Sequence, residues 1–213
     1  MHCEPDSKPP RLIGLSGGIG SGKSTVAALW QELFRVPVAD ADGISRQLTQ
    51  PGGAAVTAIA QHFGAEYVSA DGAMDRARMR QRVFADAQAK KALEAILHPL
   101  IFQALQDLVQ QAQARRQTTI VLDIPLLVES AHWRPRLDAV VIVDCSAELQ
   151  LQRVMQRSQL PAQEVQRILG QQAPRRAKLA AADLVIANGD ITLAQLRAQA
   201  QRAGALLQLE QRR

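Results

Sequence analysis

The sequence predicts an α/β fold in which a doubly wound, mostly parallel sheet of five strands carries helical insertions. Three observations support this fold class. Short apolar runs alternate with helical segments along the 213 residues, as in chains that build parallel sheets from strand–helix units. Two runs, 118–127 and 137–145, are continuously apolar, as expected for strands covered on both faces. A glycine-rich stretch stands between the first apolar run and the first helical pattern.

The predicted strands are short apolar runs that end at glycine, proline or acidic residues. They cover residues 11–16, 36–42, 118–127, 137–145 and 183–189. Helices are predicted where apolar residues recur at helical spacing or where alanine, glutamine, arginine and leucine dominate. These helical segments are 24–34, most of 51–116, 147–182 and 192–209.

Composition limits the functional classes. The formal net charge of +5 and the pI of about 9.8 suggest an anionic partner, which could be a nucleotide, a nucleic acid or a membrane surface. Aromatic residues make up only 3%, which leaves little material for stacking bases. Cys3 and Cys145 lie far apart, and no apolar run approaches the roughly 18 residues of a membrane span. Residues 1–10 lack the apolar core of a signal peptide. We therefore expect a cytoplasmic protein with a disordered N-terminal extension.

Gly17, Gly22, Lys23 and Ser24 match the phosphate-binding motif GxxxxGK[ST], and they stand between a predicted strand and a helix. Glycines let the backbone pass close to a phosphate, where a Cβ would collide. The loop and the following helix then direct N–H groups toward the anion. Lys23 can neutralise the β- and γ-phosphates, and the Ser24 hydroxyl can bind Mg²⁺. A glycine-rich turn with a solvated lysine would not explain the flanking strand and helix, so a nucleoside triphosphate site is predicted.

Three aspartates follow predicted strands. Asp40 and Asp42 alternate, so they point the same way if the strand continues through them. Either carboxylate could accept the proton of an attacking hydroxyl or orient magnesium-bound water; a polar turn or the N-cap of the next helix is an equal alternative. Asp123 ends the third apolar strand, where proteins with this phosphate loop place an acid that helps hold magnesium. Its alternative is an aspartate that begins a loop before Pro125.

Five stretches resemble the dephospho-coenzyme A kinase family in the same order along the chain: GLSGGIGSGKSTVA, VADADGISRQL, LHPLI, DIPLLVE and AADLVIANGD. The resemblance runs from about Leu12 to Leu196. It implies a three-layer P-loop kinase fold in one domain, 11–205, with an acceptor-binding helical subdomain at about 60–116, a lid at about 146–177 and a tail at 206–213. It also implies ATP-dependent phosphorylation of the ribose 3′-hydroxyl of dephospho-coenzyme A, the last step of coenzyme A biosynthesis, with Mg²⁺.

The resemblance assigns roles to individual residues. Lys23, Asp42 and Arg157 are implied to be catalytic, with Asp42 as the base that faces the acceptor hydroxyl. ATP-binding residues are implied to be Gly18, Gly20, Ser21, Gly22, Lys23, Ser24, Thr25, Arg153, Arg157, Gln172 and Asn188. Acceptor-binding residues are implied to be Asp42, Arg46, Arg76, Arg80, His98, Pro99, Leu126, Leu127 and Glu129. Magnesium ligands are implied to be Ser24 and Asp123. Without the family, His98 is a helix-capping or core residue.

The lid segment departs from the family pattern at two positions. Ser158 stands where the family often has an acid, and Pro161 stands where a serine or threonine usually caps the next helix. Proline is tolerated in a first turn, so the helix can still form. Arg153 and Arg157 lie four residues apart and can point at one anion, or they can form a solvated face beside acidic residues.

Three rival functions are considered. Another small-molecule P-loop kinase, of nucleoside monophosphate or shikimate type, would leave the DAD, HPLI and PLLVE motifs unexplained. A GTP-binding switch requires an N-K-x-D segment, which the sequence lacks. A nucleic-acid-dependent ATPase is supported only by the basic pI. We therefore expect ATP and dephospho-coenzyme A as partners, neither nucleic acid nor membrane, and a monomer or weak homo-oligomer.

Overall fold

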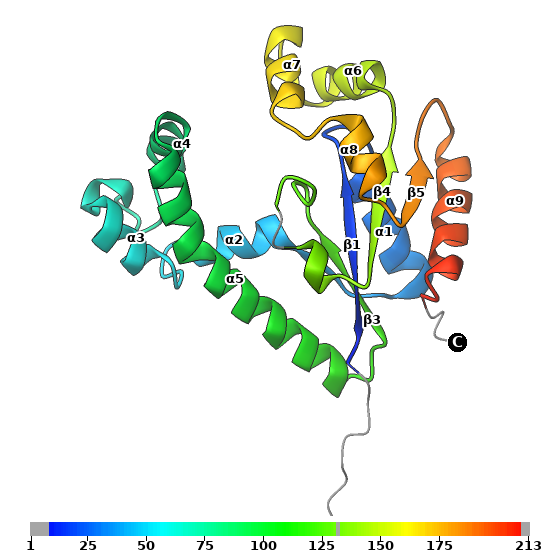
Figure 1. Cartoon of the computed structure of the whole chain (residues 1–213), viewed down its shortest axis with the longest axis horizontal. Coiled ribbons are helices and arrows are strands. Elements are labelled where there is room, and N and C mark those ends of the chain that lie inside the picture. Colours follow the sequence, from blue (N-terminus) through cyan, green and yellow to red (C-terminus); the bar gives the residue numbers. More distant parts are fainter. Residues whose placement is uncertain (1–8, 131–132, 210–213) are drawn as a thin grey trace, which may run out of the picture. The chain divides into compact units, whose positions relative to one another are not determined.

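The computed structural model describes residues 9–130 and 133–209 (Figure 1). Most of the predicted N-terminal extension and the end of the predicted tail lie outside these residues. The described strands are β1 (Arg11–Gly17), β2 (Val38–Asp40), β3 (Thr119–Asp123), β4 (Ala139–Asp144) and β5 (Leu184–Ala187). The described α-helices are α1 (Lys23–Phe34), α2 (Ala41–Thr49), α3 (Val56–Phe63), α4 (Arg76–Ala85), α5 (Ala87–Ala114), α6 (Ala147–Ser158), α7 (Ala162–Gly170), α8 (Arg175–Ala180) and α9 (Leu193–Leu206). Two 3₁₀ turns are η1 (Ala65–Tyr67) and η2 (Arg134–Arg136).

The strands form one five-stranded sheet in the order β2-β3-β1-β4-β5, which confirms the predicted sheet. β1 pairs in parallel with β3 on one side and with β4 on the other, and β4 pairs in parallel with β5. The chain thus goes from β1 to the edge strand β2, returns to β3 beside β1, and then adds β4 and β5 on the other side of β1. Ligands of such sheets bind beyond the carboxyl ends of the strands at this switch point, and the glycine-rich loop follows β1 there.

The chain divides into two compact units, of which the first comprises residues 1–39 and 112–213 and contains the sheet. Its core lies between the sheet and helices α1 and α9. Trp30 is fully buried in this core, and its indole Nε1 donates a hydrogen bond to the Ala200 carbonyl on α9 at 2.8 Å. On the other face of β1, Gly14 leaves space that Leu127 and Leu137 fill: a Cβ there would lie 2.7 and 2.6 Å from their methyl groups.

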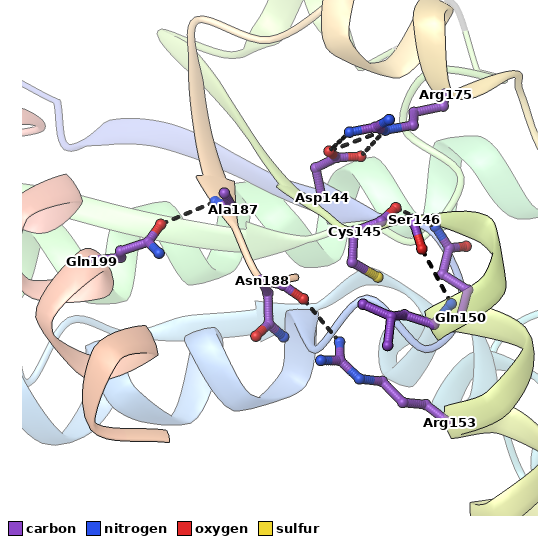
Figure 2. Close-up of polar contacts among 10 residues, drawn as sticks. Asp144, Cys145, Ser146, Gln150, Arg153, Arg175, Ala187, Asn188 and Gln199 are labelled. Atoms are coloured by element: carbon purple, nitrogen blue, oxygen red, sulfur yellow. Dashed lines mark hydrogen bonds and ion pairs between the residues drawn. The ribbon is translucent and has the colours of Figure 1, made fainter. Parts of the chain in front are cut away.

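At one edge of this sheet, the Gln199 side chain of α9 contacts the backbone of β5. Ala187 N–H donates to Oε1 of Gln199 at 3.1 Å, and Figure 2 shows this contact. The other edge strand, β2, has only three residues. One edge strand is therefore short, and the other has one backbone N–H occupied by a side chain.

The second unit, residues 40–111, is helical. Ala55, Ile59 and Met79 form its buried centre. Helix α4 begins at an N-cap, Asp75, whose side chain accepts a hydrogen bond from Arg78 N at 2.9 Å. These contacts join α3 and α4 through a small core of their own.

Helix α5 has 28 residues and contains Pro99 in its interior. By length and by a mean hydropathy of 1.2 over 18 residues it could cross a membrane. Glu94, His98 and Asp107 interrupt its apolar residues, which is why the sequence shows no continuous apolar run of that length. One such helix is weak evidence for a membrane span.

Candidate active site

The glycine-rich loop joins β1 to α1 and has the backbone of an anion-binding loop. Gly20 and Gly22 adopt φ angles of 75° and 92°, which residues with a Cβ rarely adopt. Gly22 is also the N-cap of α1 and provides no side-chain cap for that helix. The first N–H groups of a helix have no regular partner within it. Thr25 N–H donates to the Gly22 carbonyl at 3.0 Å, which leaves the N–H groups of Lys23 and Ser24 to a bound anion.

Lys23 and Asp123 form an ion pair beside this loop, and both side chains are largely buried. β1 and β3 are paired in register with Leu15 opposite Asp123, which carries the carboxylate to the lysine that begins α1. Ser24 and Thr25 are exposed at the next two positions. The carboxyl ends of β1 and β3 thus bring together an ammonium, a carboxylate, a hydroxyl and a helix N-terminus. These groups fit a magnesium–triphosphate group.

Asn188, predicted for the adenine side, lies beneath the phosphate loop. It is 7% exposed, and its Nδ2 donates to the Ser21 carbonyl at 2.7 Å. Its backbone N–H donates to the Asp144 carbonyl at 2.7 Å, which continues the pairing of β5 with β4. A Cβ on Gly22 would lie 2.2 Å from Nδ2, so the amide occupies the space that this glycine leaves open. Asn188 thereby fixes the loop's position on the sheet.

Of the two lid arginines, Arg153 is held by backbone carbonyls. Its guanidinium donates to the carbonyls of Asn188 at 3.0 Å and Gly189 at 2.8 Å, and Figure 2 shows it directed at the loop after β5. Arg157 is exposed near the end of α6. The described part of the chain shows no hydrogen bond or ion pair for Arg157. The two arginines therefore differ in their surroundings despite their i, i+4 spacing.

The segment between α7 and α8 contacts both the phosphate loop and the chain after β3. Gln172 Oε1 accepts from Ile19 N–H at 3.2 Å and from Lys178 Nζ at 3.0 Å. Glu129, predicted as an orienting acid, accepts from Ala173 N–H at 2.6 Å. The structure thus ties this segment at two points within the first unit.

A cavity of about 290 Å³ opens beside these contacts. Its polar lining includes Asp144, Gln150, Gln172, Arg175 and Lys178. Asp144 forms a bidentate ion pair with Arg175, with Nη2 to Oδ2 at 2.6 Å, and Figure 2 shows the pair. Burial lowers the pKa of Lys178, and the negative charges of Glu129 and Asp144 act in the opposite direction. Sequence reasoning missed Lys178, because a single lysine in an arginine-rich segment carries no spacing signal.

The two leucines after β3 have different environments. Leu127 is buried against Gly14, which gives it a packing role. Leu126 is 50% exposed and is available to a ligand.

The remaining predicted acceptor residues lie in the second unit. The expectation that Asp40 and Asp42 share an extended strand is wrong: β2 ends at Asp40, and Asp42 lies in the first turn of α2. Asp40 is the N-cap residue without a capping hydrogen bond, and its Oδ2 pairs instead with Arg46 Nη2 at 2.6 Å. Helix α2 begins directly after Asp40, and Asp42 in its first turn favours this start because an acid there interacts favourably with the helix dipole.

The other members of this set lie on α4 and α5. Arg76 donates to Thr49 Oγ1 at 2.7 Å, which joins the start of α4 to the end of α2. Arg80 is exposed one turn further along α4. His98 is half-buried within α5 and is followed by Pro99.

The structure combines a parallel sheet, a phosphate loop at the switch point of that sheet, a lysine–aspartate pair and an arginine-bearing helical segment after β4. These features define a P-loop phosphotransferase. The family model for dephospho-CoA kinase matches residues 11–193. The dephospho-CoA kinase of Albidiferax ferrireducens is 49% identical over 86% of this chain and 86% of its own length. That of Chromobacterium violaceum is 50% identical over 88% and 90%. The chain therefore belongs to the dephospho-CoA kinase family.

Solved structures agree with the fold. TT1252 from Thermus thermophilus has a TM-score of 0.76 and 31% identity, over 95% of this chain and 99% of that one. Dephospho-CoA kinase from Campylobacter jejuni has a TM-score of 0.67 and 24% identity, over 92% and 96%. The predicted fold class and family are confirmed. The family's reaction is ATP-dependent phosphorylation of an alcohol group of dephospho-CoA in coenzyme A biosynthesis, and the rival functions are not favoured.

Proposed function

We propose that this chain phosphorylates the ribose 3′-hydroxyl of dephospho-CoA with ATP. The phosphate loop is proposed to bind the triphosphate, and Asp42 is proposed to serve as the base. The observation that carries the first half is the Lys23–Asp123 ion pair beside the phosphate loop. It supports a site in which Lys23 binds the phosphates and Asp123 binds the metal ion.

In the proposed reaction the acceptor oxygen attacks the γ-phosphorus of ATP. The bond from that phosphorus to the β–γ bridging oxygen breaks, ADP leaves, and the hydroxyl proton passes to the Asp42 carboxylate. Lys23 transfers its contact from Asp123 to the phosphate oxygens. Mg²⁺, held by Ser24 and Asp123, would neutralise phosphate charge when bound. Gly18, Gly20, Ser21, Gly22 and Thr25 complete the loop around the phosphates.

Asp42 is assigned as the base from the family resemblance, and it is exposed in the first turn of α2. Asp40 is the alternative base, and its carboxylate pairs with Arg46. Arg46 lies one turn after Asp42 and is proposed to anchor the acceptor by exchanging this partner for a substrate phosphate.

Arg76 and Arg80 are four residues apart on α4, so they share one face of the helix. Dephospho-CoA carries a diphosphate, and two guanidinium groups on one face suit such an anion. His98 and Pro99 on α5, and Leu126, Leu127 and Glu129 after β3, are likewise proposed as acceptor-binding residues. For Leu127 and Glu129 the contribution is indirect, through packing and through the Ala173 amide.

The lid residues are proposed to act at different points. Arg157 is the exposed cation that stabilises the charge gathered on the transferred phosphoryl group. Arg153 and Asn188 position the nucleotide side through their contacts with the loop after β5 and with the phosphate loop. Gln172 is proposed to act at the nucleotide site from its place beside Ile19 of the phosphate loop. The absence of the usual acid at Ser158 is compatible with this role, because Arg157 then has no competing neighbour at that position.

We further infer that the protein is cytoplasmic, binds neither nucleic acid nor membrane, and is a monomer or weak homo-oligomer. The short and covered sheet edges support the last, since they leave little backbone for strand addition. Sedimentation of the full chain with and without ATP would test the oligomeric state.

The decisive experiment incubates the protein with ATP and dephospho-CoA and analyses the products by mass spectrometry. One added phosphate on dephospho-CoA, one ADP per product, and no transfer to a nucleoside monophosphate or shikimate are expected. Asp42→Asn should lower kcat by about 10²–10⁴-fold, with ATP binding nearly unchanged. Asp40→Asn is the matched control, because it removes an equal charge two residues away. If Asp40→Asn is the crippled variant and Asp42→Asn is active, the two roles are exchanged.

A further inference from the structure

Lys178 is a buried lysine with an incomplete set of partners. It is 9% exposed on α8, and lysines are rarely buried unless paired. Its Nζ donates to Gln172 Oε1 at 3.0 Å, which is its sole hydrogen-bond acceptor among residues 9–130 and 133–209. An ammonium has three donors, so the described structure satisfies one of them. A buried charge in this state is costly, which calls for a ligand.

The nearby carboxylates are engaged elsewhere. Asp144 is held by the bidentate contact with Arg175, and Glu129 accepts the Ala173 N–H. Burial lowers the pKa of Lys178, and these two carboxylates only partly oppose that shift. Lys178 therefore brings positive charge to the wall of the 290 Å³ cavity, which it shares with Gly18 of the phosphate loop.

The acceptor that Lys178 does have is informative. Gln172 Oε1 receives both the Lys178 ammonium and the Ile19 N–H of the phosphate loop. A loop amide and an ammonium converging on one oxygen are the donors that bind a phosphate oxygen in proteins. The neutral amide oxygen satisfies both donors less well than an anionic oxygen, because charge-assisted hydrogen bonds are roughly twice as strong.

We propose that Lys178 is a further phosphate-binding residue of the nucleotide site, and that the Gln172 carbonyl holds the place of a phosphate oxygen. When the triphosphate enters, one of its oxygens replaces Gln172 Oε1 between Ile19 N–H and Lys178. The exchange frees the segment between α7 and α8 from the phosphate loop, so nucleotide entry is coupled to release of this part of the lid. This inference rests on the proposed assignment of the triphosphate to the first unit.

The test compares Lys178→Met with Arg176→Met. Arg176 is exposed on the same helix, so its replacement removes an equal charge that does not face the cavity. Loss of a hydrogen bond to a charged group should weaken binding of ATP and of inorganic tripolyphosphate by about 10–100-fold in Lys178→Met. Binding of dephospho-CoA should not change. Arg176→Met should bind both anions within about twofold of wild type. Lys178→Met should fold, because methionine removes a buried charge at similar volume.

A second measurement needs no variant. The Nζ resonance of Lys178 in the ¹⁵N-lysine-labelled wild type should shift on addition of tripolyphosphate. Wild-type affinity in Lys178→Met, an equal loss in Arg176→Met, or an unmoved resonance would each overturn the inference. Transfer to dephospho-CoA by the wild type, measured in parallel, separates the two ideas. If transfer is present and Lys178→Met binds normally, the reaction stands and this site does not; if transfer is absent and Lys178→Met binds weakly, the reverse holds.

Discussion

Replacing Asn188 by alanine should loosen the phosphate loop from beneath. The side chain is buried, and its Nδ2 donates to the Ser21 carbonyl at 2.7 Å. Alanine leaves that carbonyl without its side-chain donor and leaves a void where Nδ2 fills the space beside Gly22. An unsatisfied buried acceptor costs about 1–3 kcal/mol. In a chain of this size each kcal/mol lowers Tm by about 2–4 °C, so Tm should fall by about 2–12 °C.

The assay combines thermal and urea unfolding with steady-state kinetics. Asn188→Ala should raise KM for ATP more than KM for dephospho-CoA, because the loosened loop serves the phosphates. Asn188→Asp keeps the size but sets a carboxylate against the Ser21 carbonyl, so it should weaken ATP binding further. Gln199→Ala is the matched control, since it also removes an amide that contacts this part of the chain (Figure 2). Gln199 is half-buried and its hydrogen bond lies at the surface, so its loss should change stability by less than about 0.5 kcal/mol.

The reasoning fails if Asn188→Ala unfolds at the wild-type temperature and keeps KM for ATP within about twofold. It also fails if Gln199→Ala causes an equal loss, because the effect would then belong to the end of β5 in general. A loss of stability without any change in KM would show that the loop holds its shape without this hydrogen bond.

Three further outcomes follow from the contacts described. Lys23→Ala should lower kcat by about 10²–10³-fold while circular dichroism stays native, since a charge-assisted contact in a dry site contributes on the order of 2–4 kcal/mol of transition-state stabilisation; near wild-type turnover at saturating ATP would contradict this. Arg157→Ala should lower kcat more than ATP affinity, by up to about 10³-fold, whereas Arg153→Ala should mainly lower Tm; unchanged kcat in Arg157→Ala would move the role elsewhere. The hydrogen bond and charge of Arg197 lower the pKa of Glu32, so the Tm difference between wild type and Glu32→Gln should be present at neutral pH and vanish as pH falls through that lowered pKa; a difference that persists in acid would refute it.

The parts of the molecule that the sequence predicts well depend on neighbouring residues. Strand, glycine loop and helix follow one another from Arg11 to Phe34, and each is encoded by its own pattern. Asp123 is predictable because parallel strands end at a common edge. The spacing of Asp40 and Asp42 did not decide between a strand and a helix start. Two aspartates at i and i+2 fit a continuing strand and the beginning of a helix equally well.

The parts that the sequence could not predict depend on contacts between distant segments. Asn188 and Ser21 are 167 residues apart, and Gln172 and Ile19 are 153 apart. No local periodicity records such a pairing. The resemblance to a family indicated that Gln172 and Asn188 matter, but their partners emerged only from the fold. Lys178 had no signal of either kind, because its burial depends on how α8 packs against β4.

The side chain of Gln199 has a consequence for the chain while it folds. An exposed strand edge is a template on which a second polypeptide can assemble, and parallel sheets, whose strands must find distant partners, assemble slowly. Gln199 on α9 occupies the Ala187 N–H, so this N–H is closed to another strand only once α9 has docked. Docking of α9 therefore shortens the time during which newly made molecules can add to one another at this edge, and loss of that helix would favour aggregation.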